Sequence, residues 1–320
     1  MDRRSFIVGS MASAGATCVQ ARAIASTGTI AEATIVVGFA PGGAGDLAAR
    51  TVSQYAISAR DIPVTLDFRP GAGGTIATDQ VARASPNGST LSLFSVSPVM
   101  VAPHLQRVPY DPLSDLTYVG SYAGISIPLF VRADSPLRTW DDLLKHARSK
   151  PGGLRWATAA PRGLPHIATE AALRQEGVSA TFIPFSGEAD AITALLGGHI
   201  EAVAAAGYAP HLDAGSIHLL IETGPQPIAE LPDLPTFRQR GYPLAISAAY
   251  GLFGPAGLSP DVIGWWEDLL QDMTTSESYE IFLKTLRGHH LFQNSATFTK
   301  TVLDGYREIG RQIELLGLRP

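Results

Sequence analysis

Short apolar runs alternate with longer amphipathic segments along most of this chain. Residues 35–39, 63–68 and 90–94 are short apolar runs that end at glycine, proline or polar residues. Residues 46–59 and 76–84 repeat their apolar side chains at helical spacing. Strands that alternate with helices form parallel sheets with helices on both faces. The pattern therefore predicts a βαβαβ unit in an α/β protein.

The same alternation resumes after an extended segment at about 117–124. The second unit has expected strands at 128–131, 155–158, 181–184, 202–205 and 219–222, and expected helices up to about 149, at 167–176 and at 189–196. Two α/β units that follow one another in this way predict two lobes, each with its own sheet.

The last part of the chain is predicted to return to the first unit. Residues 250–254 read as extended, and Ser259 is a helix cap followed by proline. The remainder reads as helical, with one break near 288–290. Crossings near 120–126 and 245–253 then divide the chain as follows. Lobe 1 comprises 26–125 and the return 249–320, and lobe 2 comprises 126–248.

The N-terminus has the features of an export signal. Arg3 and Arg4 precede a weakly apolar stretch rich in glycine, alanine and serine, and small residues follow up to Ala25. Paired arginines and mild hydrophobicity are typical of the Tat route. We expect residues 1–25 to be a Tat signal peptide that directs the chain to the periplasm, with cleavage after Ala25 or alternatively after Ala23.

Charge and cysteine content exclude several function classes. Cys18 is the only cysteine, so the mature chain is expected to have no thiol chemistry and no disulfide. Residues 1–25 carry three arginines and one aspartate, so their removal would change the formal net charge from −5 to −7. An acidic chain without a basic run is a poor nucleic-acid binder. No later segment is apolar for long enough to span a membrane.

A glycine-rich loop follows the first predicted strand and reads Phe39-Ala40-Pro41-Gly42-Gly43-Ala44-Gly45-Asp46. Glycine lets a ligand approach the backbone, and the following helix offers free N–H groups and the positive end of its dipole. A carboxylate or a phosphate would suit this geometry, whereas the alternative is a plain strand-to-helix turn. Asp46 could bind a ligand amine or hydroxyl, or could cap its helix.

Several further motifs, in this order, carry a family resemblance. They are Arg69–Ile76, Ala84–Leu91, Pro109–Pro112, Leu195–Glu201, Leu231–Thr236 and Gly254–Pro260. Together with the loop at 39–46, they make the chain from about 34 to 317 resemble the Bug (TctC-type) periplasmic solute-binding proteins of tripartite tricarboxylate transport systems.

The resemblance implies a type II-like, two-lobed Venus-flytrap fold that binds a small carboxylate in the cleft between the lobes. It implies that loops 39–46 and 158–166 hold the ligand carboxylate. No catalytic residue, cofactor or metal is expected. The implied partner is a set of membrane transporter subunits or, alternatively, a membrane signalling protein that reads the closed form.

The second loop departs from the family pattern. It reads Thr158-Ala159-Ala160-Pro161-Arg162-Gly163-Leu164-Pro165-His166. The Arg162 guanidinium could clamp a ligand carboxylate through two hydrogen bonds, or could be a solvated surface group. His166 matches a family position at a helix start. Its alternative role, which we favour slightly, is a contact with Glu170 one helical turn on.

Three other candidate positions also differ from the family. Ser95 keeps one hydroxyl where the family has more polar groups, and Phe185-Ser186 lacks the usual lysine. Tyr208 stands in a loop that has lost its polar residues and could stack on the ligand. These changes predict a less polar pocket, which favours a monocarboxylate or an aromatic acid over citrate.

Functions from other classes have weaker support. An exported hydrolase would be expected to carry a catalytic motif. Neither the serine-nucleophile motif Gly-x-Ser-x-Gly nor the zinc-protease motif His-Glu-x-x-His occurs. The effector lobes of a transcription regulator share the expected fold, but the export signal argues against them. His289 and His290 are adjacent and would not face alike on a helix, so we expect no metal site there.

Overall fold

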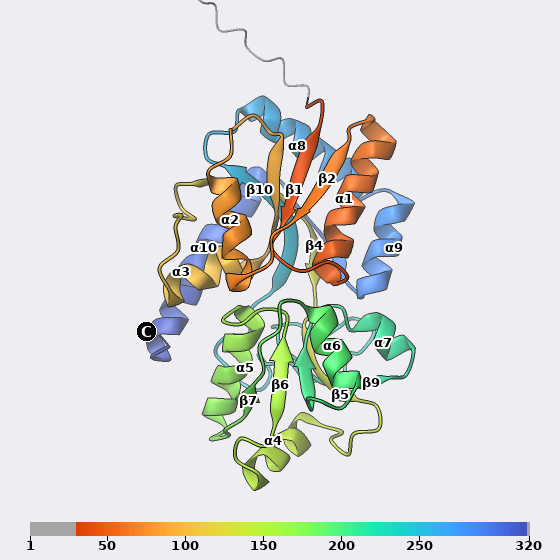
Figure 1. The fold of residues 1–320 in the computed structure, drawn as a ribbon, viewed down its shortest axis with the longest axis vertical. Coiled ribbons are helices and arrows are strands. Elements are labelled where there is room, and N and C mark those ends of the chain that lie inside the picture. Colours follow the sequence, from red (N-terminus) through yellow and green to blue (C-terminus); the bar gives the residue numbers. More distant parts are fainter. Residues whose placement is uncertain (1–29, 319–320) are drawn as a thin grey trace, which may run out of the picture.

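The computed structural model describes residues 30–318, which form two lobes joined by crossing segments (Figure 1). The predicted signal peptide, 1–25, lies outside the described residues. Lobe 1 is built on a six-stranded sheet and lobe 2 on a five-stranded sheet. The lobe boundaries that we propose follow the crossing strands, because β4 ends at Ile125 and β10 begins at Ala248.

Lobe 1 has the strand order β11-β4-β10-β3-β1-β2. Its strands are β1 (Ala33–Val37), β2 (Val64–Phe68), β3 (Thr90–Phe94), β4 (Leu116–Ile125), β10 (Ala248–Pro255) and β11 (His289–Gln293). The first three strands are parallel to one another, as the βαβαβ pattern predicts. Strand β10 runs antiparallel to β3 and β4, and β11 runs antiparallel to β4, so the whole sheet is mixed rather than parallel.

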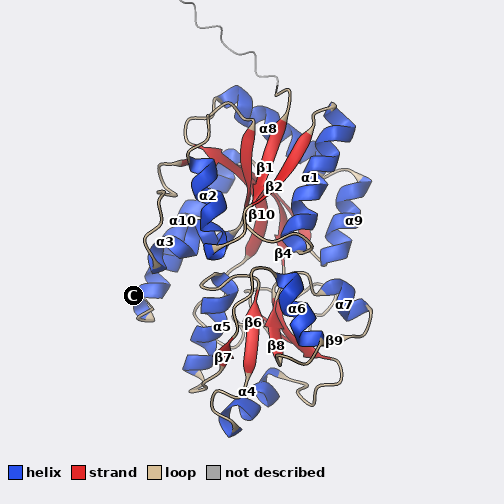
Figure 2. Cartoon of the chain, viewed as in Figure 1, coloured by secondary structure: helices blue, strands red, loops and turns tan. Residues whose placement is uncertain are grey.

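Helices cover both faces of this sheet (Figures 1 and 2). One face packs against α1 (Ala44–Arg60), α8 (Pro260–Met273) and α9 (Glu277–Leu286). The other packs against α2 (Thr75–Ala82) and α10 (Ser295–Leu315). Three short pieces complete the lobe: the 3-10 turn η1 (Ala72–Gly74), the π-helical turn η2 (Ser97–Val101) and α3 (Ala102–Leu105).

Lobe 2 has the strand order β7-β6-β8-β5-β9. Its strands are β5 (Pro128–Arg132), β6 (Arg155–Thr158), β7 (Thr181–Phe182), β8 (Ala202–Ala204) and β9 (Ile217–Glu222), and its helices are α4 (Trp140–Ser149), α5 (Leu164–Gln175), α6 (Glu188–Leu196) and α7 (Ala209–Asp213). Strands β6, β7 and β8 are parallel, whereas β5 is antiparallel to β8 and β9. The second unit therefore repeats the mixed arrangement of the first.

The structure corrects the sequence prediction in two segments. Residues 289–293 form an edge strand, where only a break in a helical segment near 288–290 was expected. His289 and His290 are exposed there, so the strand lacks an apolar run that would reveal it. Residues 97–105 are helical although no helix was predicted. Pro98 and Pro103 obscure the helical pattern, but each lies in a first turn, where proline is tolerated.

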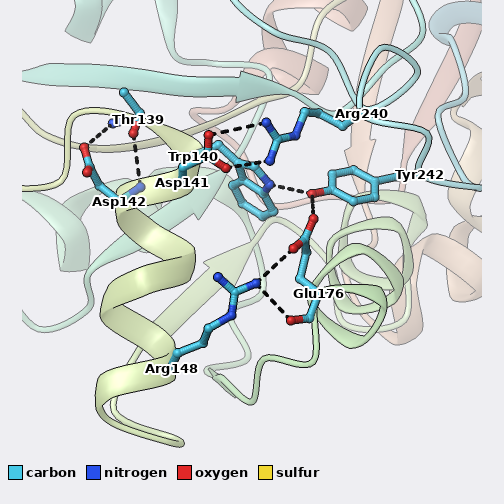
Figure 3. A network of polar contacts seen from close by, with 8 residues as sticks. All are labelled: Thr139, Trp140, Asp141, Asp142, Arg148, Glu176, Arg240 and Tyr242. Atoms are coloured by element: carbon cyan, nitrogen blue, oxygen red, sulfur yellow. Dashed lines mark hydrogen bonds and ion pairs between the residues drawn. The ribbon is translucent and has the colours of Figure 1, made fainter.

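A hydrogen-bonded cluster fixes the segment that leaves lobe 2 (Figure 3). The indole N–H of Trp140 donates to the Tyr242 hydroxyl at 2.7 Å, and that hydroxyl donates to Glu176, also at 2.7 Å. Arg240 pairs with Asp141 on the exposed side of the same cluster. Residues after β9 are thereby tied to α4 and to the end of α5. These contacts hold the chain at residues 240–242, shortly before β10 begins at Ala248.

The crossing strands β4 and β10 approach each other unusually closely. They pair from Ala248–Ile125 to Pro255–Leu116, with two irregularities in register. A Cβ atom at Gly251 would lie 2.3 Å from the Gly120 carbonyl oxygen and 3.0 Å from Ser121 Cα. Because both of these are backbone atoms, only glycine fits at position 251.

We predict that Gly251→Ala lowers the free energy of unfolding by about 2 kcal/mol or more, since the new methyl group must push two strands apart. Gly264→Ala is the matched control, because a Cβ there meets nothing within 4 Å. In the interior of α8 it should raise stability by roughly 0.5–1 kcal/mol. Urea unfolding of both variants tests this. Equal stability of the two would contradict the close approach.

Candidate functional site

A cavity of about 80 Å³ lies between the lobes, beside the loops that follow the parallel strands. Segments after β1, β3, β6 and β8 form its wall, together with the crossing segments at 125–127 and 248–250. One water needs about 10–15 Å³ of such volume, so the closed cavity has room for a small ligand only. Most of the wall is alanine, valine, isoleucine, leucine and phenylalanine. Among the described residues, its polar side chains are Ser95, Ser97, Thr158, Glu188 and Tyr250.

Five of the predicted site residues lie in this wall. They are Phe39, Gly43, Ser95, Thr158 and Ala160. They come from both lobes, which agrees with the expectation that the loops at 39–46 and 158–166 face each other across the cleft. Their role in binding remains a prediction.

Five other predicted residues line neighbouring hollows instead. Gly42, Ala44 and Asp46 line a hollow between α1 and α6. Phe185 and Ser186 line another, which lies beside the glycines of η1. The cleft is thus divided by the packing of the two lobes, and not every residue of a predicted loop reaches the same space.

Asp46 holds its own loop together. Its carboxylate accepts a hydrogen bond from the Gly42 N–H at 2.8 Å and pairs with Arg50 at 2.6 Å one turn along α1. The N-cap of α1 is Gly43 and has no side-chain cap hydrogen bond, so these contacts differ from the predicted cap, and ligand binding by Asp46 stays a prediction. Pro41, in the same loop, is exposed and lines none of the cavities described here.

Arg162 and His166 form a local pair beside the cavity. Arg162 is exposed, with a left-handed backbone (φ 58°), and its N–H donates to His166 Nδ1 at 2.7 Å. The ring of His166 stacks on Phe182 with 3.7 Å between centroids. The structure thus gives His166 a different partner from the predicted Glu170. Burial, with the Arg162 charge as a smaller cause, lowers the pKa of His166 to about 4.

Two further predicted residues lie outside the cavity wall. Gly163 precedes α5 and is packed so tightly that a Cβ would lie 2.8 Å from Ser97 Oγ. Tyr208 is fully buried in the apolar cluster of lobe 2 that contains Phe130 and Ile192. The structure therefore places Tyr208 in the core rather than against a ligand, and burial raises its pKa. An aromatic ring in a loop that has lost its polar residues can pack inward.

Glu188 is the cavity residue that sequence reasoning missed. It is the first residue of α6, and one carboxylate oxygen accepts a hydrogen bond from the Ala44 N–H across the cleft. The other oxygen accepts from the N–H groups of Ala206 and Gly207, both at 3.2 Å. Burial raises the pKa of Glu188, and the three N–H donors oppose that rise. In the sequence it looks like an ordinary acidic residue in a first helical turn.

Two hydroxyl groups of wall residues have no hydrogen-bond partner among residues 30–318. Ser95 Oγ and Thr158 Oγ1 are buried and unpaired. Ser97, by contrast, accepts a hydrogen bond from the Leu164 N–H at 3.0 Å, which links the lobes. Because a buried unpaired hydroxyl costs free energy, the two free groups mark positions where a polar ligand would be stabilised.

Residues 48–318 match the family described as tripartite tricarboxylate transporter family receptor. The chain belongs to this family. The protein BugT of Bordetella pertussis is 30% identical over 236 residues, which is 72% of each chain. A UPF0065 protein of Cupriavidus necator, encoded in the gbd 5′ region, is 28% identical over 99% of each chain. The predicted family membership is confirmed.

Solved structures of similar proteins show the same two-lobed fold as this receptor. The periplasmic binding protein BugD superposes with a TM-score of 0.83 and 24% identity, covering 90% of this chain and 98% of its own. MatC of Rhodopseudomonas palustris with bound malate gives 0.80 and 24%, covering 89% and 98%. An R. palustris protein with adipate gives 0.81 and 23%, covering 89% and 97%. The predicted two-lobed periplasmic-binding-protein fold is confirmed.

A second cavity, of about 300 Å³, lies beside the crossing segments of this family receptor. There Glu222, at the end of β9, accepts hydrogen bonds from the N–H groups of Ile127 at 3.1 Å and Gly224 at 2.9 Å. Its second carboxylate oxygen is buried and has no partner in the described part of the chain. Burial raises the pKa of Glu222 from 4.5 to about 7.

We predict that Glu222 makes the receptor less stable as the pH rises from about 4.5 to about 7. The folded protein holds this proton more tightly than the unfolded chain, so stability is lost as the proton leaves. Glu222→Gln keeps an oxygen that accepts hydrogen bonds but cannot ionise. Urea unfolding at about pH 5 and about pH 8 should show a smaller fall for E222Q, by up to roughly 3 kcal/mol. Parallel curves for the two proteins would refute this role.

Proposed function

We propose that this protein is a periplasmic binding protein that captures a small carboxylate between its lobes and delivers it to a tripartite tricarboxylate-type membrane transporter. The observation that carries the proposal is the cavity lined by loops of both lobes, whose largely apolar wall includes two unpaired hydroxyls. The proposal assigns no catalytic step to the protein.

Chemistry and comparison both support a carboxylate as the ligand. Hydroxyl groups and the N–H groups of helix N-termini donate hydrogen bonds to carboxylate oxygens. Both α1 and α5 begin beside the cavity, but their first N–H groups already donate within the protein, Ala44 to Glu188 and Leu164 to Ser97, so the wall hydroxyls carry the argument. Two family-fold neighbours are described with malate and adipate. The apolar remainder of the wall favours a monocarboxylate or an aromatic acid over citrate.

Capture by closure is supported by contacts that join the lobes at separate places. Leu164 of lobe 2 donates to Ser97 of lobe 1, and Asp213 at the end of α7 pairs with Arg287 after α9 at 2.5 Å. A ligand that bridges the two lobes would add to these contacts and shift the protein toward the closed form. The closed face would then be what the transporter reads.

Delivery from the periplasm requires export, which we assign to the Tat signal at residues 1–25. Across residues 30–318, no helix is both long and apolar enough to cross a bilayer. The proposal therefore places the described part of the chain at the outer surface of the inner membrane, where a transporter would meet it.

We predict that small carboxylic acids raise the melting temperature of the mature protein, residues 26–320, while their methyl esters do not. A ligand that binds only the folded state stabilises it by mass action. The measurement is a thermal-shift screen, repeated after unfolding and refolding to remove any retained ligand. If esters and acids act alike, or no acid acts, the carboxylate function is wrong.

We predict that Thr158→Val weakens binding of the acid found in that screen by roughly tenfold or more, since a hydrogen bond to a charged group is lost. Thr169→Val is the matched control, because Thr169 Oγ1 is also buried and unpaired but does not line the cavity. Both substitutions remove an unsatisfied hydroxyl, so neither should lower the melting temperature of the free protein. Titration calorimetry measures the affinities, and equal losses in both variants would disprove the hydroxyl contact.

A further inference from the structure

The anion-binding group at the start of α1 is already occupied by a side chain of this protein. Helix N-termini bind anions through their free N–H groups. The Ala44 N–H is such a group, and it donates to Glu188 from the opposite lobe. Two N–H groups that follow β8, those of Ala206 and Gly207, complete the set. We call these three donors the amide cradle.

The cradle is shaped around the Glu188 carboxylate. A Cβ atom at Gly43 would lie 2.8 Å from both Cγ and Oε1 of Glu188, and one at Gly207 would lie 2.9 Å from Oε1. Both are closer than real Cβ contacts, so the two glycines leave room that Glu188 fills. The side chain is 8% exposed. This is a closed site for one carboxylate, with donors from both lobes.

An occupied cradle changes what the neighbouring cavity can accept. Glu188 also lines that cavity, so its carboxylate is close to any ligand bound there. A second carboxylate on the ligand would meet a like charge in a poorly solvated space and would find the amide donors taken. The unpaired hydroxyls of Ser95 and Thr158 offer donors for one carboxylate only, in a wall that is otherwise largely apolar.

We propose that Glu188 is a tethered carboxylate that fills the amide cradle and thereby makes the cleft selective for acids with one carboxylate over acids with two. This inference rests on the proposed function, because it refines which carboxylates the cleft takes. Glu188 is therefore a specificity-determining residue of the ligand site.

The test compares monoacids with diacids of equal chain length, from two to six carbons, by titration calorimetry at mildly alkaline pH. The wild-type protein should bind its preferred monoacid at least tenfold more tightly than the matching diacid. Glu188→Ala empties the cradle, so this ratio should fall at least tenfold. Asp190→Ala is the control: it removes an exposed carboxylate from the same first turn of α6 and should leave the ratio unchanged.

A second measurement does not depend on the cleft ligand. Free acetate should raise the melting temperature of the Glu188→Ala variant more than that of the wild type at the same ionic strength, because only the variant has an empty cradle for acetate to fill. Glu188→Gln keeps the size of the side chain and serves if the alanine variant does not fold. Its loss of charge should lower the monoacid-to-diacid ratio, though less than alanine does.

The outcomes separate the two ideas. If acids bind but the wild type takes diacids as tightly as monoacids, or if Glu188→Ala and Asp190→Ala give the same ratio, selection by Glu188 is wrong and the binding function stands. If acetate rescues Glu188→Ala while no acid binds the wild-type cleft, the cradle is real and the proposed carboxylate function fails. Absence of both effects overturns both.

Discussion

The antiparallel pair of β4 and β10 is the contact on which the rest of this structure depends. Both strands belong to the sheet of lobe 1, and their ends lead directly into and out of lobe 2. Gly251 lets them lie closer than any side chain would permit. The two crossings between the lobes are therefore held side by side, as one pair of neighbouring strands. The loops after β1, β3, β6 and β8 consequently meet along one line, where the cavity forms.

Two buried carboxylates bind backbone N–H groups where the lobes meet. Glu222 binds the N–H of Ile127 in the first crossing, and Glu188 binds the N–H of Ala44 across the cleft. Each accepts only backbone donors among its described contacts, and burial raises the pKa of each. Hydrogen bonds from N–H groups stabilise the ionised form of a carboxyl group, whereas burial favours the neutral form. The contacts between the lobes therefore include two carboxyl groups whose charge depends on how deeply they are buried and on how many N–H groups they bind.

The sequence was sufficient for the architecture and for the two loops, because both depend on local patterns. Alternating periods predict strands and helices, and Phe39, in the loop after β1, and Thr158, the last residue of β6, both line the cavity. The predictions that failed concern an exposed segment or contacts between residues far apart in the sequence. The edge strand at 289–293 has no apolar run, and Tyr208 could equally face a ligand or the core. Glu188 accepts a hydrogen bond from Ala44, which lies 144 residues away in the sequence, and a local sequence pattern cannot predict such a contact.

The glycine-rich loop shows how a correct chemical inference can have an unexpected partner. From its residues, the loop at 39–46 predicts close approach of a carboxylate or a phosphate to a helix N-terminus, and the carboxyl group of Glu188 is found there. It is supplied by the protein itself, and Gly43 is small because Glu188 needs the space. A glycine-rich loop before a helix therefore identifies the kind of group that is bound but not its source. Before the ligand of such a protein is inferred, one must therefore identify the backbone donors in the cleft that already bind the protein's own carboxylates.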